Sequence, residues 1–354
     1  MIFLIRSNQI SKKVFKIIEL NYISFRFKKH FFINVLKKLH NNKKFKGVKT
    51  GNNVICKICK SQKIELIAEV DRVGFQCDTV VCSNCNFTFN KNFISNPSDF
   101  YKNHYGGNRW INPKINFNKR ISKNAFSWKR YNYLQSYFEE NSIDIKKILE
   151  VGCGDGCNLF PFFKSGKTIL GYDFGQKFLE PGINLGMDLR YGDISDVDNN
   201  SKFDLIMLVH SYEHFIDLDK VLKQIKSLLS EKGLVYVEVP GLLSMNQSIA
   251  NSQSIMGVPS SNNFINYIQF EHNYHFTLKH LTYIWERNGF YLNKGDEGIR
   301  AIFSKKEIEN YKKLKIENLK SINIINHLRN VEANFLTLHN LLKIIKRKFK
   351  LGPN

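Results

Sequence analysis

The sequence has no long apolar run. No segment reaches the roughly eighteen consecutive apolar residues of a membrane-spanning helix, so we expect none. The chain begins Met1-Ile2-Phe3-Leu4-Ile5-Arg6, and this apolar run is too short for a secretory signal. With 354 residues the chain can bury a large core, with room for one full α/β domain and smaller additions. We therefore expect a folded protein of the cytoplasm.

Acidic residues are scarce at both ends of the chain. The net charge is +22; residues 1–55 carry thirteen Lys and Arg with one acid, and residues 304–354 carry twelve with four Glu. Such extensions attract anionic lipid, nucleic acid or an acidic partner, although a compositional bias towards Lys, Asn, Ile and Phe explains them equally well. The basic, amphipathic residues 1–50 leave peripheral contact with the inner face of a membrane open. No aromatic-basic RNA motif is present, so nucleic acid is the least expected partner.

Cysteine is uncommon too, but four of the seven cysteines form two C-x-x-C pairs with 22 residues between them. The pairs are Cys56 with Cys59 and Cys82 with Cys85. Two such pairs can present four thiolates tetrahedrally to one Zn²⁺, and residues 64–81 alternate like the short strands of a zinc ribbon. Disulfides are the alternative, which a cytoplasmic location disfavours. The pattern predicts a structural zinc module at 54–92, in which Cys77 is either buried or a substitute ligand.

Three glycines alternate directly after a predicted buried strand, at Gly152, Gly154 and Gly156. Glycine permits positive φ and close approach of a ligand to the main chain, and nucleotide-like ligands bind at such turns. The third glycine comes one residue too early for the dinucleotide fingerprint, and the lysine of a triphosphate-binding loop is missing. Asp173 ends the next apolar run about twenty residues later, where a carboxylate can accept both hydroxyls of an adenosine ribose.

Strands and helices alternate from residue 147 onwards, as in an α/β protein with a parallel sheet. The predicted strands are 147–151, 168–172, 188–191, 204–209 and 234–239, followed by 290–294 and 299–304. Helices are predicted at about 122–140, 217–230 and 277–288, and 305–350 is predicted to be helical and basic. Gly233 and Gly289 are expected to end the second and third of these helices.

The motifs E-V-G-C-G-D-G at 150–156, G-Y-D at 171–173 and Y-G-D-I at 191–194 resemble class I S-adenosylmethionine-dependent methyltransferases. The resemblance continues through 203–210 and 233–240 and covers roughly residues 120–304 in order. It implies a Rossmann-like, seven-stranded, mostly parallel sheet with an antiparallel edge formed by the last two strands. It also implies S-adenosylmethionine as the cofactor.

The resemblance assigns roles to individual residues. The loop of Gly152, Cys153, Gly154 and Gly156 would cradle the methionine portion, with no redox role for Cys153. Glu150 would support the amino group and Asp173 would bind the ribose. Asp193 would bind the adenine amino group, with a capping aspartate as the alternative. His210 is expected to face the methyl end of the cofactor.

The segment after the fourth predicted strand, His210-Ser211-Tyr212-Glu213-His214, lacks the N-P-P-Y sequence of amino methylation of bases. The Glu213-His214 pair resembles one that recurs in small-molecule methyltransferases, often closing the cofactor pocket. His214 is therefore either structural or a general base.

Gln269-Phe270-Glu271-His272-Asn273-Tyr274-His275-Phe276 forms a second candidate site. Together with the upstream cysteine pairs it resembles sugar C-methyltransferases, whose Y-x-E-H motif deprotonates next to a keto group. Glu271 and His272 match that motif, whereas Gln269 stands where tyrosine is expected. A histidine base has a pKa near the working pH, although a structural histidine before a helix stays open. His275 is the weaker alternative.

The sequence thus predicts five segments: a basic extension (1–53), the zinc module (54–92), a connector with a helical cap (93–146), the methyltransferase domain (147–304) and a basic helical extension (305–354). The predicted reaction is methyl transfer to a small polar acceptor, such as a sugar, nucleotide-sugar or glycan precursor, with a histidine base. The alternatives are O-methylation of another small molecule, or a zinc-knuckle protein that binds nucleic acid.

Overall fold

The structure is a computed structural model that describes residues 50–71, 76–101, 117–244, 267–321 and 323–328. The chain divides into two units. The cysteine unit comprises Met1–Phe93, Gly241–His275 and Ile316–Asn354, and the seven-stranded unit comprises Ile94–Pro240 and Phe276–Lys315. The predicted amphipathic segment 1–50 lies almost wholly outside the described residues, as does most of the C-terminal extension. Within the described ranges, no helix combines the length and apolar character needed to cross a bilayer.

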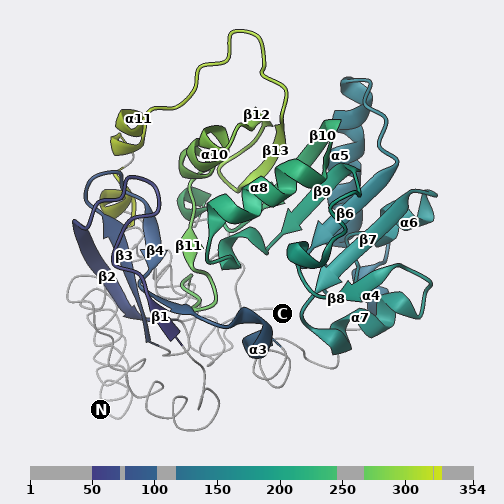
Figure 1. The fold of residues 1–354 in the computed structure, drawn as a ribbon, viewed down its shortest axis with the longest axis horizontal. Helices are drawn as coiled ribbons and strands as arrows, with labels where there is room; N and C mark the ends of the chain where they lie inside the picture. Colours follow the sequence, from purple (N-terminus) through teal and green to yellow (C-terminus); the bar gives the residue numbers. More distant parts are fainter. Residues whose placement is uncertain (1–49, 72–75, 102–116, 245–266, 322, 329–354) are drawn as a thin grey trace, which may run out of the picture. The chain divides into compact units, whose positions relative to one another are not determined.

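The seven-stranded unit is built on one sheet with the order β12-β13-β10-β9-β6-β7-β8 (Figure 1). Its strands are β6 (Lys147–Val151), β7 (Thr168–Asp173), β8 (Leu189–Tyr191), β9 (Phe203–Val209), β10 (Leu229–Glu238), β12 (Tyr291–Lys294) and β13 (Arg300–Ser304). The predicted seven-stranded, mostly parallel sheet is confirmed.

The last two strands form one edge of the sheet, as predicted, but only one of them runs against the parallel strands. β13 runs antiparallel to both β10 and β12, so the edge strand β12 points the same way as the parallel strands. The short connection between β12 and β13 explains this order, because strands joined by a few residues pair antiparallel. β13 is therefore inserted between β10 and β12.

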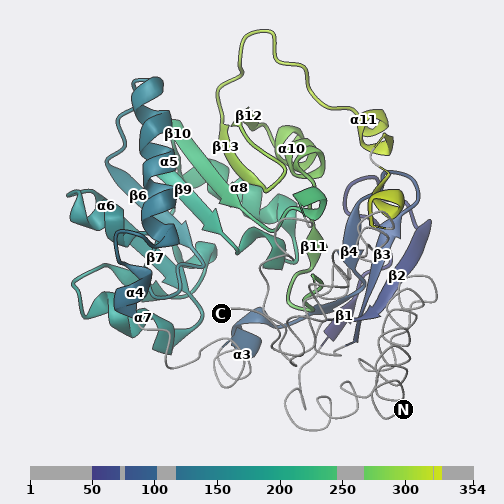
Figure 2. The ribbon, with the colours of Figure 1, turned by 180° about the vertical axis from the view of Figure 1, so that it is seen from behind.

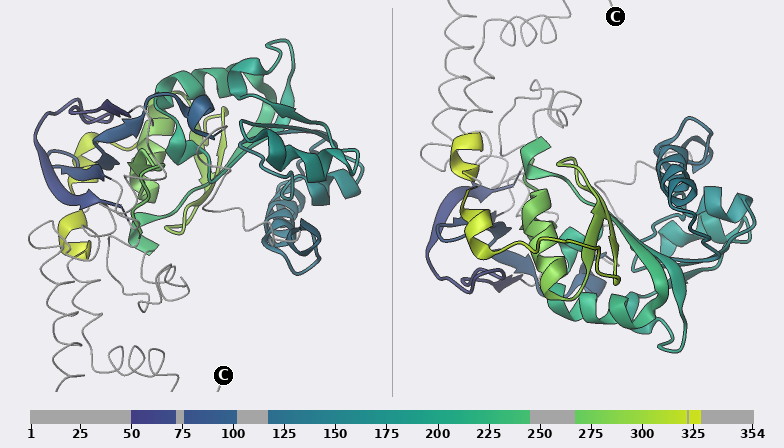
Figure 3. Two further views of the ribbon diagram at one scale, coloured as in Figure 1. Left: turned by 90° about the horizontal axis from the view of Figure 1, so that it is seen from below. Right: turned by 90° about the horizontal axis from the view of Figure 1, so that it is seen from above.

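Helices cover both faces of this sheet. α5 (Phe126–Glu140) lies on one face, best seen in Figure 2, and α8 (Leu218–Leu228) and α10 (Leu278–Arg287) lie on the other (Figures 1 and 3). The shorter helices are α3 (Pro97–Phe100), α4 (Phe117–Arg120), α6 (Phe160–Lys164), α7 (Gln176–Ile183), η2 (Ile194–Asp196) and η3 (Tyr212–His214). Because both faces are covered, β6 and β9 are buried along almost their whole length and not only at alternate residues.

Two helix boundaries differ from the prediction. α8 begins after its N-cap Asp217, as predicted, but it ends at Leu228 and β10 starts at once at Leu229. Gly233 does not end the helix; it lies inside β10 at a shift in register. A Cβ on Gly233 would come within 2.9 Å of the Phe203 carbonyl oxygen, so close packing is what requires glycine there. The helix predicted from residue 305 begins only at Ile316, because residues 305–315 are irregular.

The cysteine unit contains a four-stranded antiparallel sheet with the order β11-β4-β3-β2. The strands are β2 (Ile64–Val70), β3 (Gln76–Cys82), β4 (Thr88–Asn90) and β11 (Tyr274–His275). β1 (Thr50–Asn52) pairs with β5 (Asn92–Ile94), and this unit also contains η4 (Leu242–Ser244), α11 (Ile316–Lys320) and a helical turn at 324–328. The sequence placed residues 241–275 inside a continuous domain at 147–304, but they group with the cysteine pairs, because β11 extends the sheet of β2 to β4.

Candidate functional site

The glycine loop follows β6, where the strand order reverses between β6 and β9 and ligands bind in open α/β sheets. Gly152, Gly154 and Gly156 all have positive φ, at 79°, 55° and 76°. A Cβ on Gly152 would lie 2.7 Å from the Cβ of Ser211, so the loop packs against the segment after β9. A Cβ on Gly154 would meet nothing within 4 Å, so the backbone there faces open space.

Asp173 joins this loop to the end of β7. Its Oδ2 accepts the Gly154 N–H at 2.9 Å and its Oδ1 accepts the Gly175 N–H at 2.7 Å. Burial raises the pKa of Asp173, while the two backbone hydrogen bonds oppose that shift. Each oxygen keeps a lone pair for a ligand.

A pocket of about 830 Å³ opens over this loop, within the size range of small-molecule sites. Its wall includes the predicted residues Gly152, Gly154, Asp173, Asp193, His210 and His214. Apolar side chains line it as well, among them Phe117, Phe174, Phe178, Ile194, Phe215 and Val221. Six predicted residues are thus brought together around one cavity.

Three predicted residues lie behind the pocket wall. Gly156 packs on the side chains of Leu189 and Met187, and Cys153 is buried with its Sγ against Gly171. Glu150 is completely buried; its Oε1 accepts a hydrogen bond from Asn158 at 2.8 Å, and its Oε2 has no hydrogen-bond partner among the described residues. Burial raises the pKa of Glu150 to about 8, so this carboxyl carries a proton at neutral pH.

Asp193 has a local structural role in addition to its place in the pocket wall. It is the N-cap of η2, and its Oδ1 accepts the Ser195 N–H at 2.7 Å. The Asp196 side chain accepts the Asp193 N–H in return, which completes a capping box. The capping alternative is therefore confirmed as local structure, and a contact of Asp193 with adenine stays a prediction.

His210 adopts a left-handed backbone, with φ 53°, at the point where β9 ends. Its N–H donates to the Glu238 carbonyl at 2.7 Å, and its ring nitrogens lie 3.5 Å from Glu238 Oε1 and 3.8 Å from Glu213 Oε1. Burial lowers the pKa of His210, but the carboxylates of Glu213 and Glu238 raise it by more, so that the pKa lies at about 9. A protonated imidazole cannot act as a general base, so His210 is a cation in the pocket wall.

No sequence motif indicated the charged network beside Glu150. Arg130 of α5 donates to both oxygens of Glu238, at 2.6 and 2.7 Å, and to Asn158 Oδ1 at 3.1 Å. The Tyr236 hydroxyl donates to Glu238 at 2.8 Å. The Arg130 guanidinium and the His210 ring hold the pKa of the Glu238 carboxyl far below its usual range, against the effect of burial. Through Asn158, this network is linked to Glu150, which precedes the glycine loop.

Arg120 of α4 is a further pocket residue that the sequence analysis missed. Its Nη1 lies 2.7 Å from Asp155 Oδ2, and its Nη2 donates to Cys157 Sγ at 3.0 Å. Close to half of its side chain remains exposed. It therefore places a cation at the glycine loop, next to Asp155.

In the cysteine unit, the four paired cysteines converge. Sγ of Cys56 lies 3.5 Å from Sγ of Cys85, Sγ of Cys59 lies 3.5 Å from Sγ of Cys82, and all four lie within 4.8 Å of one another. Disulfide sulfurs lie about 2 Å apart, whereas a tetrahedral Zn²⁺ with bonds of about 2.3 Å spaces its sulfurs by about 3.8 Å. The donor set fits zinc. Cys77 is not part of the cluster; it is fully buried, with its Sγ 3.6 Å from Thr79 Oγ1.

The predicted Glu271-His272 site is held in the cysteine unit by Asn90 of β4. Asn90 Nδ2 donates to the carbonyls of Gln269 and His272, at 3.1 and 2.8 Å, and its Oδ1 accepts from Thr79 at 2.6 Å. The Asn90 N–H donates to Asn273, and His275 Nε2 lies 3.2 Å from Asn90 Oδ1. Every polar group of this buried asparagine thus serves the loop or the sheet.

His275, the weaker of the two candidate bases in this segment, is buried. Burial lowers the pKa of His275 to about 3, so this imidazole stays neutral and makes a structural contact. The side chains of Glu271 and His272 are also buried. Their catalytic role stays a prediction.

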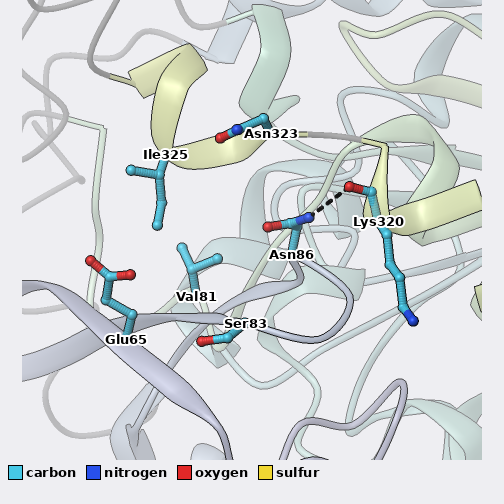
Figure 4. Close-up of a pocket in the computed structure, with 7 residues that line it drawn as sticks. All are labelled: Glu65, Val81, Ser83, Asn86, Lys320, Asn323 and Ile325. Atoms are coloured by element: carbon cyan, nitrogen blue, oxygen red, sulfur yellow. Dashed lines mark hydrogen bonds between the residues drawn. The ribbon is translucent and has the colours of Figure 1, made fainter. Parts of the chain in front are cut away.

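The cysteine unit has a pocket of its own, of about 260 Å³ (Figure 4). Asn86 Nδ2 donates to the Lys320 carbonyl across it at 3.2 Å. Glu65, Val81, Ser83, Asn323 and Ile325 complete its wall. This mixed, shallow wall has no converging set of catalytic groups.

Residues 125–294 match the family model described as a methyltransferase domain. Among curated proteins, the ubiquinone biosynthesis O-methyltransferase of Bradyrhizobium diazoefficiens is 27% identical over 97 residues, which cover 26% of this chain and 38% of that protein. The enzyme of the same name from Bartonella bacilliformis is 30% identical over 98 residues, or 26% of this chain and 40% of that protein. The chain therefore spans well under half the length of these relatives.

Solved structures show a distant similarity. The plantazolicin methyltransferase BpumL in complex with SAH has a TM-score of 0.42 and 17% identity, covering 66% of this chain and 88% of that one. An S-adenosylmethionine-dependent methyltransferase from Clostridium acetobutylicum has a TM-score of 0.38 and 16% identity, covering 56% and 92%. The family match thus makes residues 125–294 similar to a methyltransferase domain, and the glycine loop and most strands of the seven-stranded sheet lie within these residues.

Proposed function

We propose that the protein transfers a methyl group from S-adenosylmethionine to a small polar acceptor. The observation that carries this proposal is the meeting of the glycine loop and the Asp173 carboxylate in one pocket of about 830 Å³. The open space at Gly154 and the remaining acceptor sites on Asp173 fit a nucleoside with a charged tail. The volume leaves room for an acceptor beside the cofactor.

Each part of the pocket suits one part of the cofactor. Asp173 would accept the ribose hydroxyls, and the apolar side chains Phe174, Ile194 and Val221 would enclose the adenine, with Asp193 at its amino group. Arg120 is suited to the methionine carboxylate, because guanidinium and carboxylate form paired hydrogen bonds. Glu150 is expected to act from behind the loop, through Asn158, and not through direct contact.

The chain's contribution to the reaction is mainly positioning. The bound cofactor supplies an activated methyl group, so the protein must align a nucleophile with it, exclude water and remove a proton where the acceptor carries one. A histidine base is proposed for that last step. His214 lies in the pocket wall, and Glu271-His272 is the alternative from the cysteine unit.

A sugar-like acceptor is the first candidate substrate. Its support is that Glu271-His272 and the four cysteines, which together resemble sugar C-methyltransferases, belong to one unit, in which Asn90 holds the loop of Glu271-His272. O-methylation of another small molecule is the second candidate. Its support is that the curated relatives are named as O-methyltransferases.

The four cysteines are proposed to bind one structural Zn²⁺. Four thiolates close a tetrahedral site with no open position for a substrate, which is typical of structural zinc. The metal would hold the two ends of the β2–β3 hairpin and the turn after β3.

The first test is calorimetric titration of the full chain with S-adenosylmethionine and with S-adenosylhomocysteine. Saturable binding of both is expected, and no binding of either would refute the proposed function. The second test incubates the protein with radiolabelled S-adenosylmethionine and two probes, a nucleotide-linked 4-keto-6-deoxysugar and a catechol. Label on a carbon of the sugar supports C-methylation, whereas label on the catechol oxygen supports the O-methyltransferase alternative.

A further inference from the structure

α3 and the residues beside it line one side of the pocket. Ser95, Asn96, Pro97 and Ser98 belong to the pocket wall, as does Tyr101 at the end of the helix. All of them lie in the seven-stranded unit, together with every other residue of the wall. A helix of four residues is not stable by itself. The position of α3 therefore depends on contacts with the rest of this unit.

Two side-chain contacts tie α3 to opposite sides of the pocket. The Ser98 hydroxyl lies 3.2 Å from the hydroxyl of Tyr191, the last residue of β8. The Tyr101 hydroxyl lies 2.7 Å from Nδ1 of His214, in η3 after β9. In the sheet, β6 and β7 lie between β9 and β8, and the pocket is formed at the ends of these four strands. α3 thus crosses the end of the sheet where the pocket opens.

Tyr191 connects α3 to the part of the pocket where the cofactor ribose is proposed to bind. Tyr191 of β8 lies opposite Asp173 of β7 in the sheet, and the Gly192 N–H donates to the Asp173 carbonyl at 3.1 Å. The Tyr191 ring packs edge-on against Phe174, with ring centroids 6.2 Å apart. Phe174 and Gly192 both line the pocket. One side chain therefore contacts α3 through its hydroxyl and the ribose end of the pocket wall through its ring.

The contact between Ser98 and Tyr191 can open at small cost. Tyr191 is 44% exposed, and the hydrogen bond between the two hydroxyls lies at the surface. When such a bond breaks, both hydroxyls find water as a partner, so the net contribution of the bond is modest. The buried Phe100 side chain, by contrast, anchors the end of α3. α3 therefore has a buried anchor and a contact that can break without unfolding the unit.

We propose that Ser98 and Tyr191 form a latch that holds α3 against the ribose end of the pocket and slows the release of bound cofactor. This proposal rests on the proposed function and names two positioning residues for it. Tyr191 lies outside the pocket wall and acts through Ser98 and Phe174, which line it. The cofactor leaves after the two hydroxyls separate and α3 moves aside. Methyl transfer itself needs neither hydroxyl.

The deciding experiment measures how fast radiolabelled S-adenosylmethionine leaves the full-length protein during a chase with unlabelled S-adenosylmethionine. Tyr191→Phe keeps the ring against Phe174 and removes its hydroxyl, and Ser98→Ala removes the other hydroxyl. Each variant is expected to release the cofactor roughly five-fold faster, because one net hydrogen bond is lost and such losses appear mainly in the dissociation rate. The double variant should be no faster than either single one, because both changes remove the same contact.

Two further variants serve as controls. Ser98→Thr retains a hydroxyl at the same position and should restore the release rate of the wild-type protein. Tyr131→Phe removes a phenol that packs on Phe162 outside the pocket wall, and it should leave the rate unchanged. An unchanged rate in Tyr191→Phe or Ser98→Ala would overturn the latch, and so would accelerations that add up in the double variant.

Amide hydrogen exchange supplies a second arm that needs no cofactor. In α3 the Phe100 N–H donates to the Asn96 carbonyl at 3.1 Å, and the Tyr101 N–H donates to the Ser98 carbonyl. If the latch holds α3 in place, these two amides exchange faster in Tyr191→Phe than in the wild-type protein. Equal exchange in the two proteins would overturn the latch.

The outcomes separate the latch from the proposed function. A wild-type protein that binds S-adenosylmethionine, but whose release rate is the same in both latch variants, would overturn the latch while methyl transfer stands. Failure of the wild-type protein to bind S-adenosylmethionine would instead refute the proposed function. Exchange at the two α3 amides would then still decide whether Ser98 and Tyr191 hold the helix.

Discussion

The two units bury very different interiors. The seven-stranded unit packs one large apolar cluster between its sheet and α5, and several of its buried charges lie beside the pocket. The described part of the cysteine unit also has apolar side chains in its interior, but these share it with cysteine thiols and a polar set around Asn90. Buried apolar surface stabilises a domain by about 25 cal/mol per Å². A small domain buries less of it, and so it needs a metal or a hydrogen-bonded network as well. Perturbations of the two units should therefore be separable.

The largest difference between the units is expected on losing the zinc site. Cys85→Ser should abolish stoichiometric zinc in metal analysis and unfold the cysteine unit, because metal binding supplies about 10–16 kcal/mol to small zinc folds. Hydrogen exchange should show lost protection in β2 to β4 while β6 and β9 stay protected. Cys77→Ala is the control and should keep its zinc, because Cys77 lies outside the cluster. A wild-type protein that contains no zinc, with all four cysteines reduced, would contradict the metal site.

Removal of Arg130 should produce the opposite pattern. Arg130→Met leaves the Glu238 carboxylate buried without its main partner and should cost about 3–5 kcal/mol in urea unfolding of the seven-stranded unit. Arg300→Met breaks an exposed ion pair with Asp296 in the same unit and should cost less than about 1 kcal/mol. Equal losses for the two variants would show that the Arg130 network has no special role.

The pocket itself is tested by Asp173. Asp173→Ala should weaken binding of S-adenosylmethionine roughly 100-fold, since two hydrogen bonds to a charged group are worth about 3 kcal/mol together. The exposed Asp144→Ala serves as the control for loss of one negative charge. Calorimetry gives both affinities, and an unchanged Kd for Asp173→Ala would contradict the proposed contact between Asp173 and the ribose.

Asn90 tests whether the loop of Glu271 and His272 depends on the cysteine unit. Asn90→Ala should destabilise this unit by about 2 kcal/mol, because several buried groups lose their partners. Exchange should quicken at residues 269–275, with cofactor affinity unaltered. Asn53→Ala, at an exposed turn, should change stability by less than about 0.5 kcal/mol. Weakened cofactor binding in Asn90→Ala would show that the units are coupled.

The smallest effect is expected from the pH dependence of His210. Its pKa is raised from 6.5 to about 9, so its stabilising contribution is complete below about pH 6.5 and is lost as the pH rises through 9. Solvent screening of its half-exposed ring limits this to less than about 1 kcal/mol. The stability difference from His210→Asn, which tolerates a left-handed backbone, should shrink between pH 6 and pH 9.5. A difference independent of pH would exclude the ion pair.

The local patterns predicted the elements well. The predicted strand 147–151 coincides with β6, and 168–172 and 204–209 each lie within one residue of β7 and β9, because buried parallel strands are continuous apolar runs. The end of α8 was misplaced because Gly233 was taken as a helix stop, although its conformation is extended and packing requires it. Glu150 was expected beside the ligand because the motif specifies its position in the chain and not the direction of its side chain.

What could be inferred from sequence alone depends on neighbours in the chain. The glycine loop, its acidic partner and the C-x-x-C pairs lie within short spans whose spacing restricts the chemistry, and so the loop at the pocket and the cluster of four cysteines were predictable. Contacts between residues far apart in the chain are visible only in the folded structure. Arg130 meets Glu238 across 108 positions, Tyr101 meets His214 across 113 and Asn90 meets His272 across 182. Such contacts form only in the folded protein. Burial makes each partner necessary to the other, and no local sequence pattern records the pairing.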